Sequence, residues 1–222
     1  MYFQFLIEDP SGQILVERVM EKIKAVHPGM EYSCKSFHGI GGFTRRNTVK
    51  ETKDGKLLND LATYLAGFDR SLGAMGREAA VFVVIDNDDR DTGSFRNELE
   101  RVAKSRKVRI DYVFCIAVEE MEAWLLGDEN AVVRAYPQAK TNVLRGYVQD
   151  DICGTWELLA DAIYRGGSAK LKKDGQSYRS IGTVKCEWAG NIGEFLDIHK
   201  NRSPSFQYFV GEIEKRLSGA RS

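Results

Sequence analysis

The stretch AVFVVIDNDDRDTG, residues 80–93, decides the fold, because an apolar run stops abruptly in four aspartates spread over six positions. Such a run, bounded by turn-forming residues, predicts a buried strand that ends in a loop. Side chains two positions apart on a strand point the same way, so we expect Asp86 and Asp88 to project together from its carboxyl end. In open α/β sheets, ligands bind at that end.

The residues around this stretch alternate between strand and helix patterns. Apolar residues recur at helical spacing after Asp9-Pro10, which is typical of a capped helix start, and again between the second and third strands. We take Ser94 as the cap of the helix that follows the aspartates. The pattern predicts an α/β fold with a mostly parallel, four-stranded sheet flanked by helices. The predicted strands are 2–8, 30–37, 79–85 and 108–118, and the predicted helices are 10–26, 57–72 and 94–105.

After Glu119 the sequence shows helical patterns only. Residues 165–187 contain Gly166-Gly167, several basic residues and few large apolar ones, so we expect a mobile basic loop there. This division predicts an α/β domain over residues 1–127 and a C-terminal helical extension, residues 128–222, packed on it. The predicted helices of the extension side are 119–126, 129–136, 155–164 and 205–217.

Bulk composition excludes few functions. The formal net charge is zero, so no overall basic character marks a nucleic-acid-binding protein, although local basic patches can exist. The four cysteines are widely separated and lack zinc-ligand spacing, which is typical of reduced thiols in a cytoplasmic protein. The first residues reach Glu8 too soon for a signal peptide, and no apolar run is long enough to span a bilayer. We therefore expect a cytoplasmic protein with no membrane partner.

Acidic residues follow three of the predicted strands. Glu8 follows the first, Asp86 and Asp88 the third, and a group of three glutamates the fourth. Parallel strands bring these ends to one edge, and an oxygen-only cluster suits Mg²⁺ or Mn²⁺. Within the group Glu119, Glu120 and Glu122 we favour Glu122, since an acidic residue is also expected simply to stabilise the first turn of a helix. The candidate metal and catalytic residues are therefore Glu8, Asp86, Asp88 and Glu122, although Asp86 to Asp91 can also be read as a solvated acidic turn.

Basic residues in the predicted loops are candidates for contact with phosphate. They could follow a nucleic-acid backbone or neutralise charge in a phosphoryl-transfer transition state. For each residue singly, an ordinary solvated surface position is the simpler interpretation. The candidates are Arg45, Arg46, Lys170, Lys173 and Lys185, with Lys172 and Arg179 in the same segments.

The order of these motifs resembles the TOPRIM superfamily of topoisomerases, bacterial primases and overcoming-lysogenization-defect nucleases. Glu8 resembles the glutamate of that superfamily and Asp86-Asn87-Asp88 its D-x-D motif, whereas Asp9 stands where glycine is usual. The segments VIDNDDRD, VEEMEAWLLGD and NRSPSFQYF resemble, over nearly the whole chain, the bacterial family named domain of unknown function 4276.

The resemblance implies a magnesium-binding, TOPRIM-like fold in which Asp86 and Asp88 hold metal and Glu8 acts as a general acid or base. It also implies a role beside an ATPase partner in phage or mobile-element defence. In the same family Ser203-Pro204-Ser205-Phe206 resembles a signature, and physically a serine there can cap the last helix while Phe206 packs inward.

Our first hypothesis is therefore a metal-dependent nuclease that hydrolyses phosphodiester bonds in nucleic acid. Two alternatives stay open at this stage. A TOPRIM-like module could bind nucleic acid or a partner protein without cutting, because fold does not fix function. A phosphohydrolase acting on a small phosphate ester would use the same metal chemistry.

Overall fold

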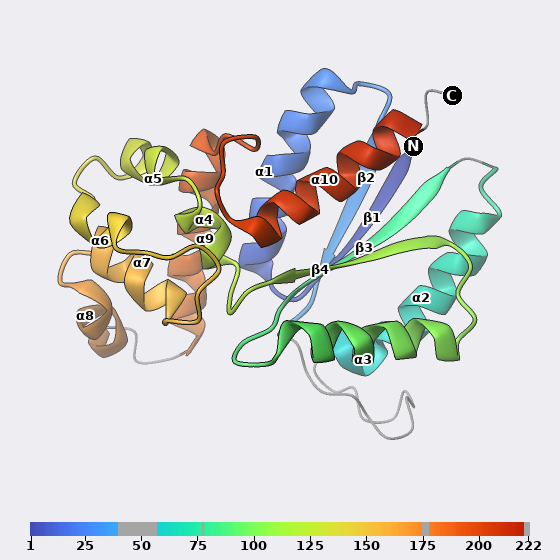
Figure 1. Cartoon of the computed structure of the whole chain (residues 1–222), viewed down its shortest axis with the longest axis horizontal. Helices are drawn as coiled ribbons and strands as arrows, with labels where there is room; N and C mark the ends of the chain where they lie inside the picture. Colours follow the sequence, from blue (N-terminus) through green and yellow to red (C-terminus); the bar gives the residue numbers. More distant parts are fainter. Residues whose placement is uncertain (40–56, 77, 175–177, 220–222) are drawn as a thin grey trace.

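Four parallel strands form the central layer of the molecule, as the computed structural model in Figure 1 shows. The structure describes residues 1–39, 57–76, 78–174 and 178–219. The strands β1 (Tyr2–Ile7), β2 (Glu31–Ser36), β3 (Ala79–Asp86) and β4 (Asp111–Ala117) lie in the order β2-β1-β3-β4. The predicted α/β class with a four-stranded parallel sheet is confirmed. Every strand therefore delivers its carboxyl end to the same edge of the sheet.

Helices cover both faces of the sheet (Figure 1). The helix α1 (Pro10–Val26) packs on one face, and α2 (Leu57–Gly73) and α3 (Thr92–Ser105) pack on the other. Asp9 caps α1 as predicted, since its side chain accepts a hydrogen bond from Gly12 N. The prediction that Ser94 caps α3 is wrong, because Asp91 is the cap and accepts from Ser94 N at 2.8 Å. The helix begins two residues earlier than expected, at Thr92.

In the described residues after β4 the regular elements are helices. No helix in this or any other described segment is long and apolar enough to cross a membrane. The predicted mobile loop over residues 165–187 is wrong, because this segment holds α8 and the first half of α9. Leu171 anchors α8, and Trp188 and Ile192 bury one side of α9 in the core beneath α1. The lysines and glycines of this segment interrupt the helical spacing of its apolar residues, so the sequence pattern does not indicate the two helices. The helices are α4 (Glu122–Leu126), α5 (Glu129–Ala135), α6 (Thr141–Arg145), α7 (Thr155–Ile163), α8 (Gly167–Asp174), α9 (Tyr178–Phe195) and α10 (Pro204–Gly219).

One hydrophobic cluster joins the C-terminal helices to the sheet. Phe209 of α10 stacks on Trp124 of α4 at 5.0 Å between ring centroids, and it meets the rings of Phe5 and Phe82 edge-on. Ser203 caps α10 and Phe206 is fully buried, as predicted. The proposed boundary near residue 127 stays a prediction, but this core is continuous across it.

Replacing Phe209 with Ala should lower the free energy of unfolding by about 3–5 kcal/mol, because a large ring would leave a cavity between sheet and helices. Urea denaturation measures this change. Tyr208→Ala, at the neighbouring and 41% exposed position, is the matched control and should cost less than about 1 kcal/mol. Equal, small effects of the two substitutions would contradict the assignment of α10 to the core.

Candidate functional site

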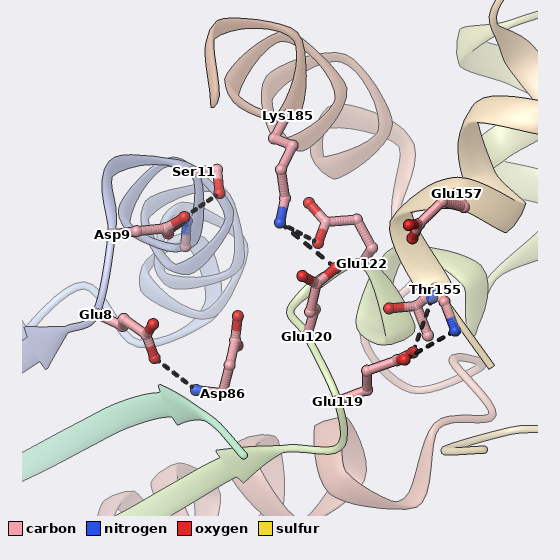
Figure 2. A network of polar contacts seen from close by, with 12 residues as sticks. Glu8, Asp9, Ser11, Asp86, Glu119, Glu120, Glu122, Thr155, Glu157 and Lys185 are labelled. Atoms are coloured by element: carbon pink, nitrogen blue, oxygen red, sulfur yellow. Dashed lines mark hydrogen bonds and ion pairs between the residues drawn. The ribbon is translucent and has the colours of Figure 1, made fainter. Parts of the chain in front are cut away.

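Two carboxylates meet where β1 and β3 end. Glu8 follows β1 directly, and its backbone N–H donates to Val84 O at 3.0 Å, which extends the pairing by one residue. The Glu8 side chain turns toward β3, and its Oε2 accepts from the backbone N–H of Asp86 at 3.0 Å (Figure 2). Asp86 is the last residue of β3 and is 9% exposed. The structure thus brings together two candidate residues that the sequence places at the ends of parallel strands, and it shows that these strands are neighbours.

The turn after Glu8 is held by the start of α1. Asp9 accepts from Gly12 N at 2.7 Å and from the Ser11 hydroxyl at 2.8 Å. A Cβ atom at Gly12 would lie 2.9 Å from Ile7 Cγ2, so only glycine allows the helix to approach the strand this closely. The aspartate at position 9 therefore forms a helix cap and still leaves Glu8 in contact with Asp86.

An ion pair forms the second half of the site. Lys185 of α9 places its Nζ 2.9 Å from Glu122 Oε2 and 3.6 Å from Glu120 Oε2 (Figure 2). The Glu122 side chain is 2% exposed and that of Lys185 is 14% exposed. The expectation of Lys185 as a loop cation is wrong, since it lies on a helix and points inward between carboxylates. The Lys185 ammonium therefore neutralises carboxylates of the protein itself and is not presented to solvent.

Burial raises the pKa of both carboxyl groups at the strand ends. It raises the pKa of Glu8 to about 7, against the hydrogen bond from Asp86, which lowers it; the charges of Asp9 and Asp88 raise it further. The pKa of Asp86 lies well above its ordinary value, first because of burial and then because of the neighbouring charge of Glu8. Two carboxylates held together and away from water resist being ionised at the same time.

The same competition governs the glutamates beside Lys185. Burial raises the pKa of Glu120 to about 7 and raises that of Glu122, although Lys185 pulls both down. Burial by itself would lower the pKa of Lys185, but the charges of Glu122, Glu120 and Asp86 outweigh it and raise that pKa. The ammonium is therefore charged, and it faces more carboxylates than it can neutralise.

Asp88 does not project beside Asp86. Its backbone is left-handed, with φ at 51°, so the strand alternation that would align the two side chains has already ended. The Asp88 carboxylate is exposed and pairs with Arg90 Nη1 at 2.8 Å.

Glu119 was expected to begin a helix, but its backbone is left-handed. Its carboxylate instead accepts hydrogen bonds from three backbone N–H groups at the start of α7, those of Cys153, Gly154 and Thr155. The helix α4 begins only at Glu122.

Sequence reasoning missed Asn87, which joins the loops after β3 and β4. Its Nδ2 donates to Arg90 O at 2.7 Å and to the Thr92 hydroxyl at 2.9 Å, and its Oδ1 accepts from Glu119 N at 2.5 Å. The residue is completely buried. The sequence signal for this role is the position of Asn87 between two aspartates in a predicted turn, because asparagine side chains in turns often form hydrogen bonds with nearby backbone groups. Glu120, which we ranked below Glu122, also belongs to the cluster.

Of the basic candidates that the structure describes, Lys185 lies within the cluster and the lysines of α8 lie outside it. Arg45 and Arg46 lie outside the described residues, as does the side chain of Arg179. Lys170, Lys172 and Lys173 are exposed on α8, where Lys170 pairs with Asp174 at 2.7 Å and Lys172 with Glu157 at 3.1 Å.

A cavity of about 280 Å³ adjoins the cluster on the side of α7. Asp88, Glu120 and Glu157 contribute acidic groups to its wall, and Trp156 contributes an aromatic ring. Lys172 lies at its rim, since it contacts both Glu157 and the ring of Trp156. Of the clustered carboxylates, Glu120 lines this cavity, whereas Glu8, Asp86 and Glu122 do not.

The donor chemistry of the site fits a hard divalent cation. Asp86 Oδ1 is buried and has no hydrogen-bond partner, and burial, followed by the charges of neighbouring carboxylates, raises the pKa of both Asp86 and Glu8. Within the described ranges no three Asp, Glu, His or Cys side chains are already arranged as a metal-ligand set. Magnesium is commonly held by only one or two carboxylates together with retained waters. Asp86 and Glu8 could supply those carboxylates. Glu122 is engaged by Lys185, and Asp88 faces solvent.

Fold and site together define an α/β protein with a buried acidic cluster at the carboxyl edge of a parallel sheet. The chain belongs to the family described as domain of unknown function (DUF4276), whose model matches residues 7–214. No curated protein gives a significant match, and no solved structure does.

Replacing Lys185 with Met should lower the free energy of unfolding by about 3–5 kcal/mol, because Glu122 would be left buried without its counter-ion. The double variant Lys185→Met/Glu122→Met should recover most of this loss, since it removes both charges. Urea denaturation at neutral pH measures both. Lys173→Met, on the exposed face of α8, serves as the control and should be nearly neutral; a double variant no more stable than Lys185→Met would rule out the proposed pairing.

The stability of the metal-free protein should fall as the pH rises from 4.5 to about 7. Folded Glu8 has a pKa of about 7 against an ordinary value of 4.5, so across this window the folded state keeps a proton that the unfolded state has lost. The stabilisation is complete below the unfolded pKa and is lost as the pH rises through the folded pKa. Glu8→Gln should reduce this fall by on the order of 2–3 kcal/mol. Denaturation in EDTA at stepped pH measures it.

The exposed variant Glu98→Gln is the control for this titration and should keep the wild-type pH dependence. The same steep dependence in Glu8→Gln would show that Glu8 is not the group responsible.

Proposed function

We propose that this protein is a metal-dependent nuclease that hydrolyses phosphodiester bonds in nucleic acid. The observation that carries the proposal is the unpartnered, buried Asp86 Oδ1 beside Glu8 at the carboxyl edge of a parallel sheet. This edge is where α/β proteins bind ligands, and a bound cation would stabilise the ionised form of both carboxylates, which burial disfavours. The resemblance of Glu8 and Asp86-Asn87-Asp88 to the TOPRIM motifs is consistent with the same chemistry.

In this proposal Asp86 and Glu8 have separate tasks. Asp86 Oδ1 would hold Mg²⁺ or Mn²⁺, which would polarise the phosphate and lower the pKa of a bound water. Glu8, whose pKa of about 7 suits exchange near neutral pH, would accept the proton of that water. Its Oε2 is oriented by the Asp86 backbone, which fixes the side chain without removing its ability to take up a proton.

Nucleic acid would approach along the cavity beside α7. The exposed lysines of α8 can contact backbone phosphates through charge alone, and Lys172 contacts Glu157 and Trp156, which line the cavity. Trp156 offers a ring on which a base could stack. Lys185 would act differently: it holds Glu122 and Glu120 in place and limits the negative charge that the substrate phosphate meets. An ATPase partner, which the TOPRIM resemblance suggests, is part of the same proposal.

One observation favours the second candidate, a binding module that does not cut. Lys185 already supplies a buried counter-ion to half of the cluster, as a charge network kept for stability alone would require. Metal-dependent thermal stabilisation without turnover would support this candidate. Release of phosphate from nucleotides without cleavage of polymers would support a small-molecule phosphohydrolase instead.

The direct test is cleavage of plasmid, linear duplex, single-stranded DNA and RNA by purified protein with Mg²⁺ or Mn²⁺. We expect metal-dependent cutting that EDTA and Asp86→Asn abolish and that Glu8→Gln slows by roughly 10²–10⁴-fold. Asp88→Asn should retain most of the activity, because the Asp88 carboxylate pairs with Arg90 at the surface.

Stability separates chemistry from folding in this experiment. Asn in place of Asp86 removes a buried charge whose Oδ1 has no partner, so Asp86→Asn should be at least as stable as the wild type. Glu98→Gln is the matched surface control and should cut normally. Cleavage that persists in both Asp86→Asn and Glu8→Gln would refute a nuclease site at this edge of the sheet.

A further inference from the structure

A second cavity lies away from the acidic cluster, where the end of α9 meets the start of α5 and the segment ahead of α10. Its volume is about 500 Å³. Phe195, which lines it, is the last residue of α9 and lies about 15 Å along that helix from Lys185. Figure 1 shows α5 at the end of the molecule opposite α2 and α3. This cavity is therefore separate from the site at the carboxyl edge of the sheet.

Two arginines bring positive charge to the wall of this cavity. The guanidinium of Arg134 lies over the ring of Phe195, at 4.5 Å from the ring centroid. Arg202 lines the same cavity, and its backbone N–H donates to Gly127 O at 2.9 Å. Within the described parts of the chain, neither guanidinium forms an ion pair with a carboxylate. Both residues are exposed, so a ligand can reach them from solvent.

The three carboxylates of the wall are already engaged within the protein. The two oxygens of Asp128 accept backbone N–H groups at 3.0 Å and 2.9 Å. Glu129 pairs with Arg145 at 3.1 Å, and Asp197 pairs with Lys200 at 3.2 Å. The charge left for a ligand is therefore that of the two guanidiniums, and the cavity favours an anion.

The backbone and the ring beside the arginines hold them in place. A Cβ atom at Gly127 would overlap the Asn201 side chain, so only glycine allows this close approach. Asn201 is 3% exposed and anchors the segment that carries Arg202. The ring of Phe195 restrains Arg134, whose N–H groups stay in the plane of the guanidinium, where they can bind an oxyanion. Groups held in this way lose little freedom when a ligand binds.

We propose that this cavity binds a phosphate group through the guanidiniums of Arg134 and Arg202. Each guanidinium can donate two parallel hydrogen bonds to two phosphate oxygens. A phosphate has enough oxygens for two such forks, whereas one fork already satisfies a carboxylate. The amide of Asn130, which lines the same cavity, supplies a further donor.

The phosphate can belong to a small phosphate ester or to the backbone of a nucleic acid. The volume of the cavity lies within the range of about 300–1,000 Å³ that small-molecule sites occupy. Both ligands present the same group to the two arginines, so one series of titrations tests the site and identifies the source.

Isothermal titration calorimetry of the full chain in EDTA, with sodium phosphate and with AMP, tests the site. We expect saturable binding that sodium acetate at the same ionic strength does not reproduce. Arg134→Gln and Arg202→Gln should each weaken binding roughly tenfold or more, because each removes a charge-assisted pair. Arg134→Lys keeps the charge but loses the fork, and it should also weaken binding. Arg101→Gln, at an exposed position on α3, is the control and should bind as the wild type does.

A short single-stranded oligonucleotide, titrated in the same buffer, identifies the source. Binding of phosphate and AMP without the oligonucleotide indicates a small phosphate ester. Binding of the oligonucleotide that Arg134→Gln/Arg202→Gln loses indicates a backbone phosphate. Either result supports the site.

The absence of binding by all three probes would overturn the proposal, and so would binding that both single substitutions leave unchanged. Acetate bound as tightly as phosphate would overturn the assignment to a phosphate group. Because EDTA removes divalent metal and cleavage is not measured, the result is independent of the proposed nuclease activity.

Discussion

The burial of like charges at one edge of the sheet is the constraint on which the rest of this structure depends. Glu8, Asp86, Glu120 and Glu122 are brought from three segments of the chain to a region in which, among the described residues, Lys185 supplies the positive charge. Desolvation makes each ionised carboxylate costly, and their proximity makes each one costlier for its neighbours. The cluster can persist only because the elements that carry it are firmly packed.

The C-terminal helices supply that packing and also the counter-charge. Lys185 reaches the cluster because α9 lies along α1, and α1 begins with the cap at Asp9 directly after Glu8. On the other side Glu119 holds the start of α7, and Asn87 ties the loop after β3 to the loop after β4. The residues beyond position 127 are therefore part of the site. The family model likewise extends beyond the sheet region, over residues 7–214.

Sequence patterns were sufficient for the sheet and for the pairing of Glu8 with Asp86, because a buried strand followed by acidic residues is a local signal. They failed where the backbone left regular geometry. Asp88 was expected beside Asp86, but a left-handed φ of 51° turns it outward, and no periodicity reports such a turn. Lys185 was assigned to a loop because its helix is rich in glycine and polar residues. Its contact with Glu122 joins segments far apart in the chain, which a single sequence cannot show.

Charge balance argues that the cluster serves more than stability. A network kept only to hold the fold would be expected to satisfy its own groups, as Lys185 does for Glu122. Asp86 differs: its Oδ1 is buried with no hydrogen-bond partner, and the charge that acts on it most strongly is that of another carboxylate, Glu8. A buried, unsatisfied carboxylate costs stability, and apolar residues at the same position would avoid that cost. Its position on a rigid strand, at the edge where α/β proteins bind ligands, is what a cation-dependent site requires.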